Sequence, residues 1–116
     1  MENPINYTID GANLVLSGLD LPVKMPYPIE KVVVVENTLA VLLTIPRGTV
    51  ENENVMGLNA DGEIIWQIER IPHVYEDSPY INIAVENRDL IAFNWDGDKV
   101  NISPTNGKAK RIGYSK

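Results

Sequence analysis

Residues 32–45 read VVVVENTLAVLLTI, with apolar runs from Val32 to Val35 and from Leu39 to Ile45 on either side of Glu36-Asn37. A strand that is apolar or β-branched at successive positions is typically covered on both faces, because its side chains alternate between them. The two runs therefore predict a hairpin in the middle of the fold, packed on both sides.

The same hairpin pattern occurs a second time from Ile81 to Trp95, and each copy is followed by two further strand-like segments. The glycines that close the later turns, Gly62 and Gly107, lie 45 residues apart. A period of roughly 40 to 50 residues with about four short strands per unit is that of a β-propeller blade. This period indicates an architecture and carries no chemistry.

The remaining segments add strands and turns. Residues 5–16 alternate around Asp10-Gly11 and predict an opening hairpin, and three prolines make residues 18–28 an extended connector. No stretch of about a dozen residues has the period of a helix. We expect one all-β domain over residues 1–116, an antiparallel meander of about nine strands. It would contain two blade-like four-stranded units and the opening hairpin, packed as a sandwich or an open barrel.

Two segments resemble the blade motif of quinoprotein-type β-propellers, in which an aspartate-rich turn with glycine precedes a strand carrying tryptophan. They are LNADGEIIWQI, residues 58–68, and ISPTNGK, residues 102–108. The resemblance implies that Trp66 packs between neighbouring blades, and the second copy has Arg111 at the equivalent position. No cofactor or substrate residue of that family is matched. The chain as a whole resembles small uncharacterised bacterial β-proteins, which implies no activity.

Copy number limits what the resemblance implies. Propellers close with about four to eight blades, whereas this chain supplies two at most. Either copies of the chain complete a ring, or the two units pack on each other. The second arrangement is favoured, because one chain then buries both apolar faces. By pattern, Trp66 and Phe93 belong to that core.

Composition excludes several kinds of protein. Because the chain has no cysteine, disulfides, thiolate metal ligands and thiol nucleophiles are excluded. Met1 to Tyr7 lack the basic and apolar regions of a signal peptide, and the longest apolar run is too short to cross a bilayer as a helix. We expect a soluble, cytoplasmic protein that does not bind membranes.

Charge is divided unevenly along the chain, whose formal net charge is −6. Residues 1–98 carry all sixteen carboxylates and five basic residues, a net of −11, and residues 99–116 carry five basic residues and no acid. The basic residues are interleaved with apolar ones, which predicts a solvated strand face beside acidic neighbours. An acidic body disfavours nucleic acid and favours a basic protein partner.

The sequence contains few residues arranged as a catalytic or metal-binding site would require. His73 is the only histidine, and no nucleophile motif frames the nearby Ser78. A spacing that resembles a calcium loop is found in Asn94, Asp96 and Asp98, but the glycine and the distal glutamate of such a loop are misplaced. We therefore predict no enzyme, no metal site and no cofactor.

Aromatic and acidic residues near the proline-rich segment 71–79 are better candidates for binding. Aromatic residues flanked by polar ones at loop ends are typical of protein-binding hot spots. The predicted binding residues are Tyr75, Glu76, Asp77, Tyr80 and Trp95.

These observations favour a noncatalytic protein-interaction module with an acidic surface, in the manner of small inhibitor or immunity proteins. Its expected partner is a protein, with a basic one favoured by charge. Two alternatives stay open at this point. One is a binder of small ligands or glycans through residues 71–80 and Trp95, and the other is a self-assembling structural subunit that forms homo-oligomers.

Overall fold

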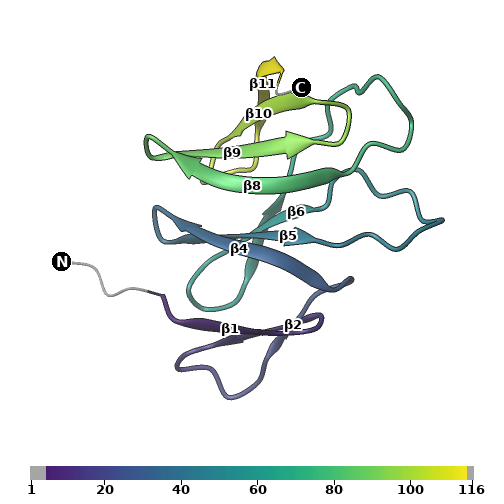
Figure 1. Ribbon diagram of the computed structural model, residues 1–116. Helices are drawn as coiled ribbons and strands as arrows, with labels where there is room; N and C mark the ends of the chain where they lie inside the picture. The colour runs from purple at the N-terminus through teal and green to yellow at the C-terminus, as the bar shows by residue number, and fades with distance from the viewer. Residues whose placement is uncertain (1–4, 115–116) are drawn as a thin grey trace.

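The chain folds into three antiparallel sheets that stack as layers (Figure 1). The computed structural model describes residues 5–114; none of these residues forms a helix, so no membrane-spanning helix is found among them. Within this part of the chain no sheet closes into a barrel. The predicted all-β architecture is confirmed, and its arrangement is layered and sandwich-like. The described residues form eleven strands where about nine were expected, and one of them, Val23–Lys24, lies in the proline-rich segment predicted as a connector and pairs with Asn13–Leu14.

Each sheet is built from strands that follow one another in sequence. The first sheet contains β1 (Tyr7–Asp10), β2 (Asn13–Leu16) and β3 (Val23–Lys24). The middle sheet contains β4 (Ile29–Val35), β5 (Thr38–Leu43), β6 (Val55–Leu58) and β7 (Ile64–Gln67). The last sheet contains β8 (Tyr80–Glu86), β9 (Asp89–Asn94), β10 (Asp98–Ile102) and β11 (Ala109–Tyr114). The two four-stranded sheets are thus the two sequence repeats, and the opening hairpin forms most of the first sheet.

The middle sheet separates two hydrophobic cores. All six residues of β5 are buried, and their side chains alternate between the two faces of the sheet. Ala40 and Leu42 join the core toward the last sheet, whereas Leu39, Val41 and Leu43 join the core toward the first. The prediction that this hairpin is covered on both sides is confirmed.

The β4–β5 and β8–β9 hairpins close with equivalent two-residue turns. Glu36 and Asn37 have φ of 48° and 62°, and Asn87 and Arg88 have φ of 50° and 72°. Two consecutive residues with positive φ are the mark of a type I′ turn, whose twist matches that of antiparallel strands. Each turn contains an asparagine, which tolerates this region better than most residues. The repeat therefore extends to turn geometry.

Trp66 joins the middle sheet to the last sheet. The residue is buried, and its indole Nε1 donates a hydrogen bond to the Pro104 carbonyl in the β10–β11 turn, with an N···O distance of 2.8 Å. Gly57 and Gly107 lie so close to its ring that a Cβ on either glycine would crowd the indole. The predicted inward orientation of Trp66 is confirmed.

The outer face of the last sheet corrects one core prediction. Phe93 is only partly buried and lies on the face opposite Leu90 and Ala92, which enter the core. The Lys99 ammonium lies over the Phe93 ring, 5.8 Å from its centroid. Assigning Phe93 to the core was wrong because β9 is apolar on both faces, so its alternation alone does not show which face turns inward.

Replacing Gly57 with alanine should destabilise the fold by roughly 1–3 kcal/mol, because the added methyl group must displace the Trp66 ring from its packed position. Gly113→Ala is the matched control, since a Cβ at that residue meets no atom within 4 Å. Urea unfolding of the two variants measures the difference. Equal free energies of unfolding would contradict the packing described for Trp66.

Candidate functional site

The two repeats differ most in the connection between their second and third strands. In the middle sheet this connection is residues 44–54, whereas in the last sheet it is the short turn at residues 95–97. Loop 44–54 emerges from the same end of the stack as the β7–β8 loop, residues 68–79 (Figure 1). These two loops and the 95–97 turn form the walls of a hollow.

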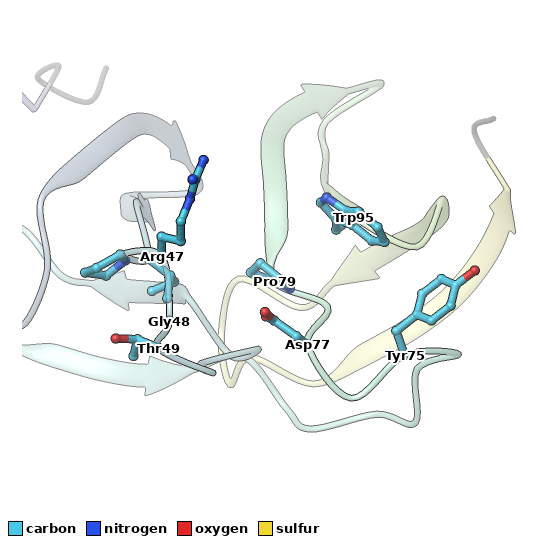
Figure 2. A pocket seen from close by; sticks show the side chains of 9 residues that line it. Arg47, Gly48, Thr49, Tyr75, Asp77, Pro79 and Trp95 are labelled. Carbon is cyan, nitrogen blue, oxygen red and sulfur yellow. The ribbon is translucent and has the colours of Figure 1, made fainter.

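This hollow, the loop-end pocket, has a volume of about 450 Å³ and opens to solvent. Its walls are formed by Ile45, Pro46, Arg47, Gly48, Thr49, Tyr75, Asp77, Pro79 and Trp95. Figure 2 shows residues 47–49 on one wall, with Asp77, Pro79 and Trp95 facing them. A smaller hollow of about 200 Å³ shares Ile45 and Pro79 with the pocket, so the two adjoin between the middle and last sheets.

Three of the predicted binding residues meet at this pocket: Tyr75, Asp77 and Trp95. The rings of Tyr75 and Trp95 form an edge-to-face pair, with centroids 5.7 Å apart and planes at 79°. Tyr75 is 54% exposed and Trp95 is 50% exposed, although aromatic rings in a small domain usually contribute to its core. We call these two residues the aromatic pair.

The other two predicted binding residues lie elsewhere. Tyr80 is 3% exposed and belongs to the core, because a bulge in β8 between Tyr80 and Asn82 turns its side chain inward. Burial, and then the charge of Glu53, raise the pKa of the Tyr80 hydroxyl above its ordinary value. Glu76 is exposed and does not line the pocket. Tyr80 is therefore a core residue and not an exposed contact of the loop-end pocket, although it lines the smaller adjoining hollow.

Two asparagines, one buried and one partly buried, fix the pocket walls to each other. Asn54 is buried; its Nδ2 donates to the Tyr80 carbonyl at 2.9 Å, and its Oδ1 accepts from the Tyr80 N–H at 2.7 Å. Asn52 Nδ2 donates to the Glu76 carbonyl at 2.7 Å, and its Oδ1 accepts from the Ser78 N–H at 2.9 Å. Each bond joins loop 44–54 to the segment that carries the aromatic and acidic wall, so the pocket is formed before any ligand arrives.

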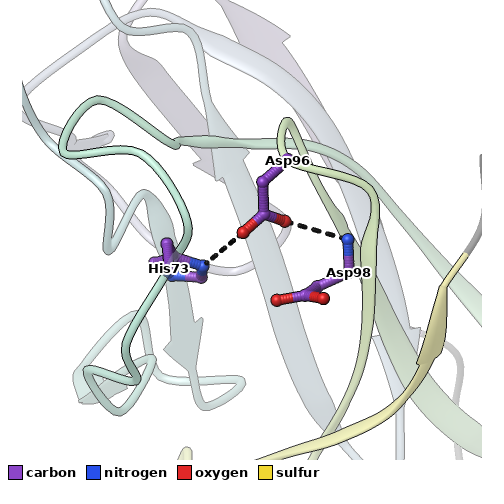
Figure 3. Close-up of side chains that lie close together, drawn as sticks. All are labelled: His73, Asp96 and Asp98. Carbon is purple, nitrogen blue, oxygen red and sulfur yellow. Dashed lines mark hydrogen bonds and ion pairs between the residues drawn. The ribbon is translucent and has the colours of Figure 1, made fainter.

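A polar clamp holds loop 68–79 to the β9–β10 turn (Figure 3). His73 Nδ1 lies 3.3 Å from Asp96 Oδ2, and both side chains are buried. Asp96 Oδ1 accepts from the Asp98 N–H at 2.9 Å, as Figure 3 also shows. Arg111 Nε donates to Asp98 Oδ2 at 2.6 Å, and Arg111 Nη2 donates to the Pro72 carbonyl. The clamp ties together the two segments from which the aromatic pair projects.

The surroundings of Asp96 favour its charged form. Burial raises the pKa of this carboxyl, but hydrogen bonds from the backbone N–H groups of Asp98 and Val74, together with the His73 ring, outweigh that effect. The net result is an Asp96 pKa below its ordinary value. The ionised carboxylate is therefore the form that closes the clamp.

The clamp also accounts for the calcium-like spacing. One ligand atom from each of His73, Asp96 and Asp98 lies within 4.8 Å of the others, as metal ligands can. However, Asp96 already accepts two backbone hydrogen bonds, and Asp98 is paired with Arg111, so a cation would have to displace these bonds. Asn94 Oδ1 accepts from the Asp96 N–H, which closes the turn. We interpret this cluster as structural.

Ser78 has a structural part in the same loop. It is fully buried, and its Oγ donates to the Tyr75 carbonyl at 2.9 Å. Its own carbonyl accepts from Asn94 Nδ2 at 2.8 Å. A hydroxyl held in this way is closed off from solvent, so the Ser78 side chain serves to shape the loop beneath Tyr75.

The wall formed by loop 44–54 was missed by sequence reasoning. Arg47 and Thr49 line the pocket, although neither is among the binding residues predicted from the sequence. The signal that could have found them is the mismatch between the repeats, residues 44–54 in one and residues 95–97 in the other. This longer loop faces the aromatic pair across the pocket.

Comparison with known proteins gives a family. The chain belongs to the family described as Domain of unknown function (DUF7957), whose family model matches residues 5–114. No curated protein and no solved structure matches the chain. Since the match spans β1 to β11, the family's domain is the whole three-sheet unit.

Asp96→Asn should lower the free energy of unfolding at about pH 7 by roughly 1–3 kcal/mol, because a buried, charged acceptor is lost. The folded-state pKa of Asp96 lies below its unfolded value. Its contribution to stability is therefore present above about pH 4 and is lost as the pH falls through the folded pKa.

Urea unfolding near pH 7 and near pH 2 tests this, with Asp61→Asn, an exposed site in the β6–β7 turn, as the control. A penalty for Asp96→Asn that is as large in acid as at neutral pH would exclude a role for the carboxylate charge.

Proposed function

We propose that this member of the DUF7957 family is a noncatalytic protein-interaction module that binds its partner at the loop-end pocket. The observation that carries the proposal is the half-exposed aromatic pair at the pocket wall. Exposed tryptophan and tyrosine supply much of the binding energy at protein interfaces, because they bury a large area with few rotatable bonds.

The surroundings of the pocket support a protein as the partner. Two exposed apolar residues, Val50 and Val74, follow and precede the lining residues Thr49 and Tyr75 in sequence, and the exposed Ile81 lines the smaller adjoining hollow. An open hollow with apolar residues around it suits a protruding segment of another protein better than an enclosed small molecule. The asparagine bonds and the clamp hold the walls in position, which reduces the entropy cost of binding.

Charge supports a basic partner. Loops 44–54 and 68–79 together carry five carboxylates and two arginines, a net charge of −3. Opposite charges around a binding site accelerate encounter and exclude partners of the same sign. The outer face of the last sheet is less suited to docking, since the Lys99–Glu86 ion pair at 2.9 Å already covers part of it.

A glycan is the second candidate ligand. The aromatic rings lie on the same wall as Asp77, with Arg47 on the opposite wall (Figure 2), so the pocket offers both a stacking surface and hydrogen-bonding groups, the combination with which proteins hold sugar rings. Tryptophan fluorescence separates the two candidates. A sugar stacked on Trp95 should shift emission at high salt as well as at low salt, whereas binding of a basic protein should weaken as salt screens its charges.

Capture from a lysate of the source organism tests the proposed function. The tagged protein should retain a protein at about 0.1 M salt and release it at several-fold higher salt. Trp95→Ala should abolish retention, because truncating a central aromatic residue of an interface costs about 2 kcal/mol or more. Leu21→Ala, at the exposed connector of the first sheet, is the control and should retain the partner. Retention by the Trp95 variant would overturn the proposal.

Association kinetics with the captured partner test the electrostatic part. Reversing two carboxylates with Glu76→Lys and Asp77→Lys should lower the association rate at low salt by about tenfold or more. Asp61→Lys with Asp89→Lys makes the same change of charge at the opposite end of the strands and should have a much smaller effect. An unchanged rate in the first variant would show that charge near the pocket does not guide encounter.

A further inference from the structure

The chemistry of the loop-end pocket suits one type of side chain. The aromatic pair meets at nearly a right angle, and the Asp77 carboxylate lies on the same wall (Figure 2). Ring faces of tryptophan and tyrosine attract cations, and a neighbouring carboxylate adds a hydrogen-bonded ion pair. The net negative charge of the two loops acts in the same direction.

We propose that the loop-end pocket binds an arginine side chain presented by the partner protein, an inference that rests on the proposed function. The guanidinium group stacks against Trp95 and donates hydrogen bonds to Asp77. Arginine fits better than lysine, because its planar group stacks on a ring and meets a carboxylate with two parallel N–H groups.

Arg47 provides a second way to test the proposed arginine site. It lies on the wall opposite Asp77, and Figure 2 shows its side chain extending away from the Asp77 carboxylate. The space beside Asp77 is therefore left to the incoming group. Because Arg47 carries the same charge as that group, it weakens binding by repulsion, and reversing its charge should strengthen binding.

Titration with short peptides, followed by NMR, tests the inference. The probes are acetylated and amidated Gly-Arg-Gly and Gly-citrulline-Gly, which have similar shapes and differ in charge. The protein has two tryptophans, so two indole N–H signals report separately on Trp95 and on buried Trp66. The Trp95 signal should move with the arginine peptide, while the Trp66 signal stays in place.

The inference predicts how peptide affinity should change with the probe and with each variant. Affinity for the arginine peptide should exceed that for the citrulline peptide by about fivefold or more, and Asp77→Asn should reduce it by a similar factor. Arg47→Glu should increase it. Asp61→Asn, remote from the pocket, should leave it unchanged.

Each other outcome overturns the inference in a distinct way. Equal response to both peptides would show that charge is not recognised. No response, with capture of a protein that still depends on Trp95, would remove the arginine site and leave the proposed function standing. No response together with no Trp95-dependent capture would remove both.

Discussion

Burial of β5 on both of its faces is the constraint on which the rest of the structure depends. Its residues supply side chains to two cores in alternation, so neither core can form without this strand. Burying one leucine or valine side chain contributes about 1.5–3 kcal/mol to the stability of the fold. In a strand that is buried on both sides, nearly every residue makes such a contribution. The first and last sheets are then the two covers that this strand requires.

The position of the site follows from that layering. Two meanders stacked in chain order bring the loop after β5, the loop after β7 and the turn after β9 to one end of the molecule. Polar side chains there bond across the loops and not only within them, as Asn54 does between the middle and last sheets. The exposed aromatic pair is thus supported by buried, satisfied polar groups, which is the arrangement expected of a surface kept rigid for binding.

Sequence was a good guide wherever periodicity and turn chemistry decide the structure. Apolar runs on both sides of Glu36-Asn37 predicted the central hairpin, and alternation predicted that Trp66 points inward. Prediction failed where local pattern is ambiguous. Phe93 lies in a strand apolar on both faces, and the inward turn of Tyr80 depends on a bulge that no residue type announces. The part of the pocket wall that contains Arg47 was missed because its position depends on how the middle sheet and the last sheet pack against each other. A local sequence pattern does not contain that information.

The contrast between Trp66 and Arg111 shows how a repeat changes when it becomes the last one. Trp66 is covered by the last sheet, and its indole donates to the Pro104 carbonyl of that sheet. Arg111, at the equivalent position, has no further sheet to cover it, and an exposed indole there would be a liability. The arginine instead donates to Asp98 and to the Pro72 carbonyl, in the loop that carries Tyr75. Arg111 therefore leaves no exposed tryptophan at this position of the last sheet, and it also holds loop 68–79 in place. That loop carries Tyr75, part of the surface through which we propose that the protein binds.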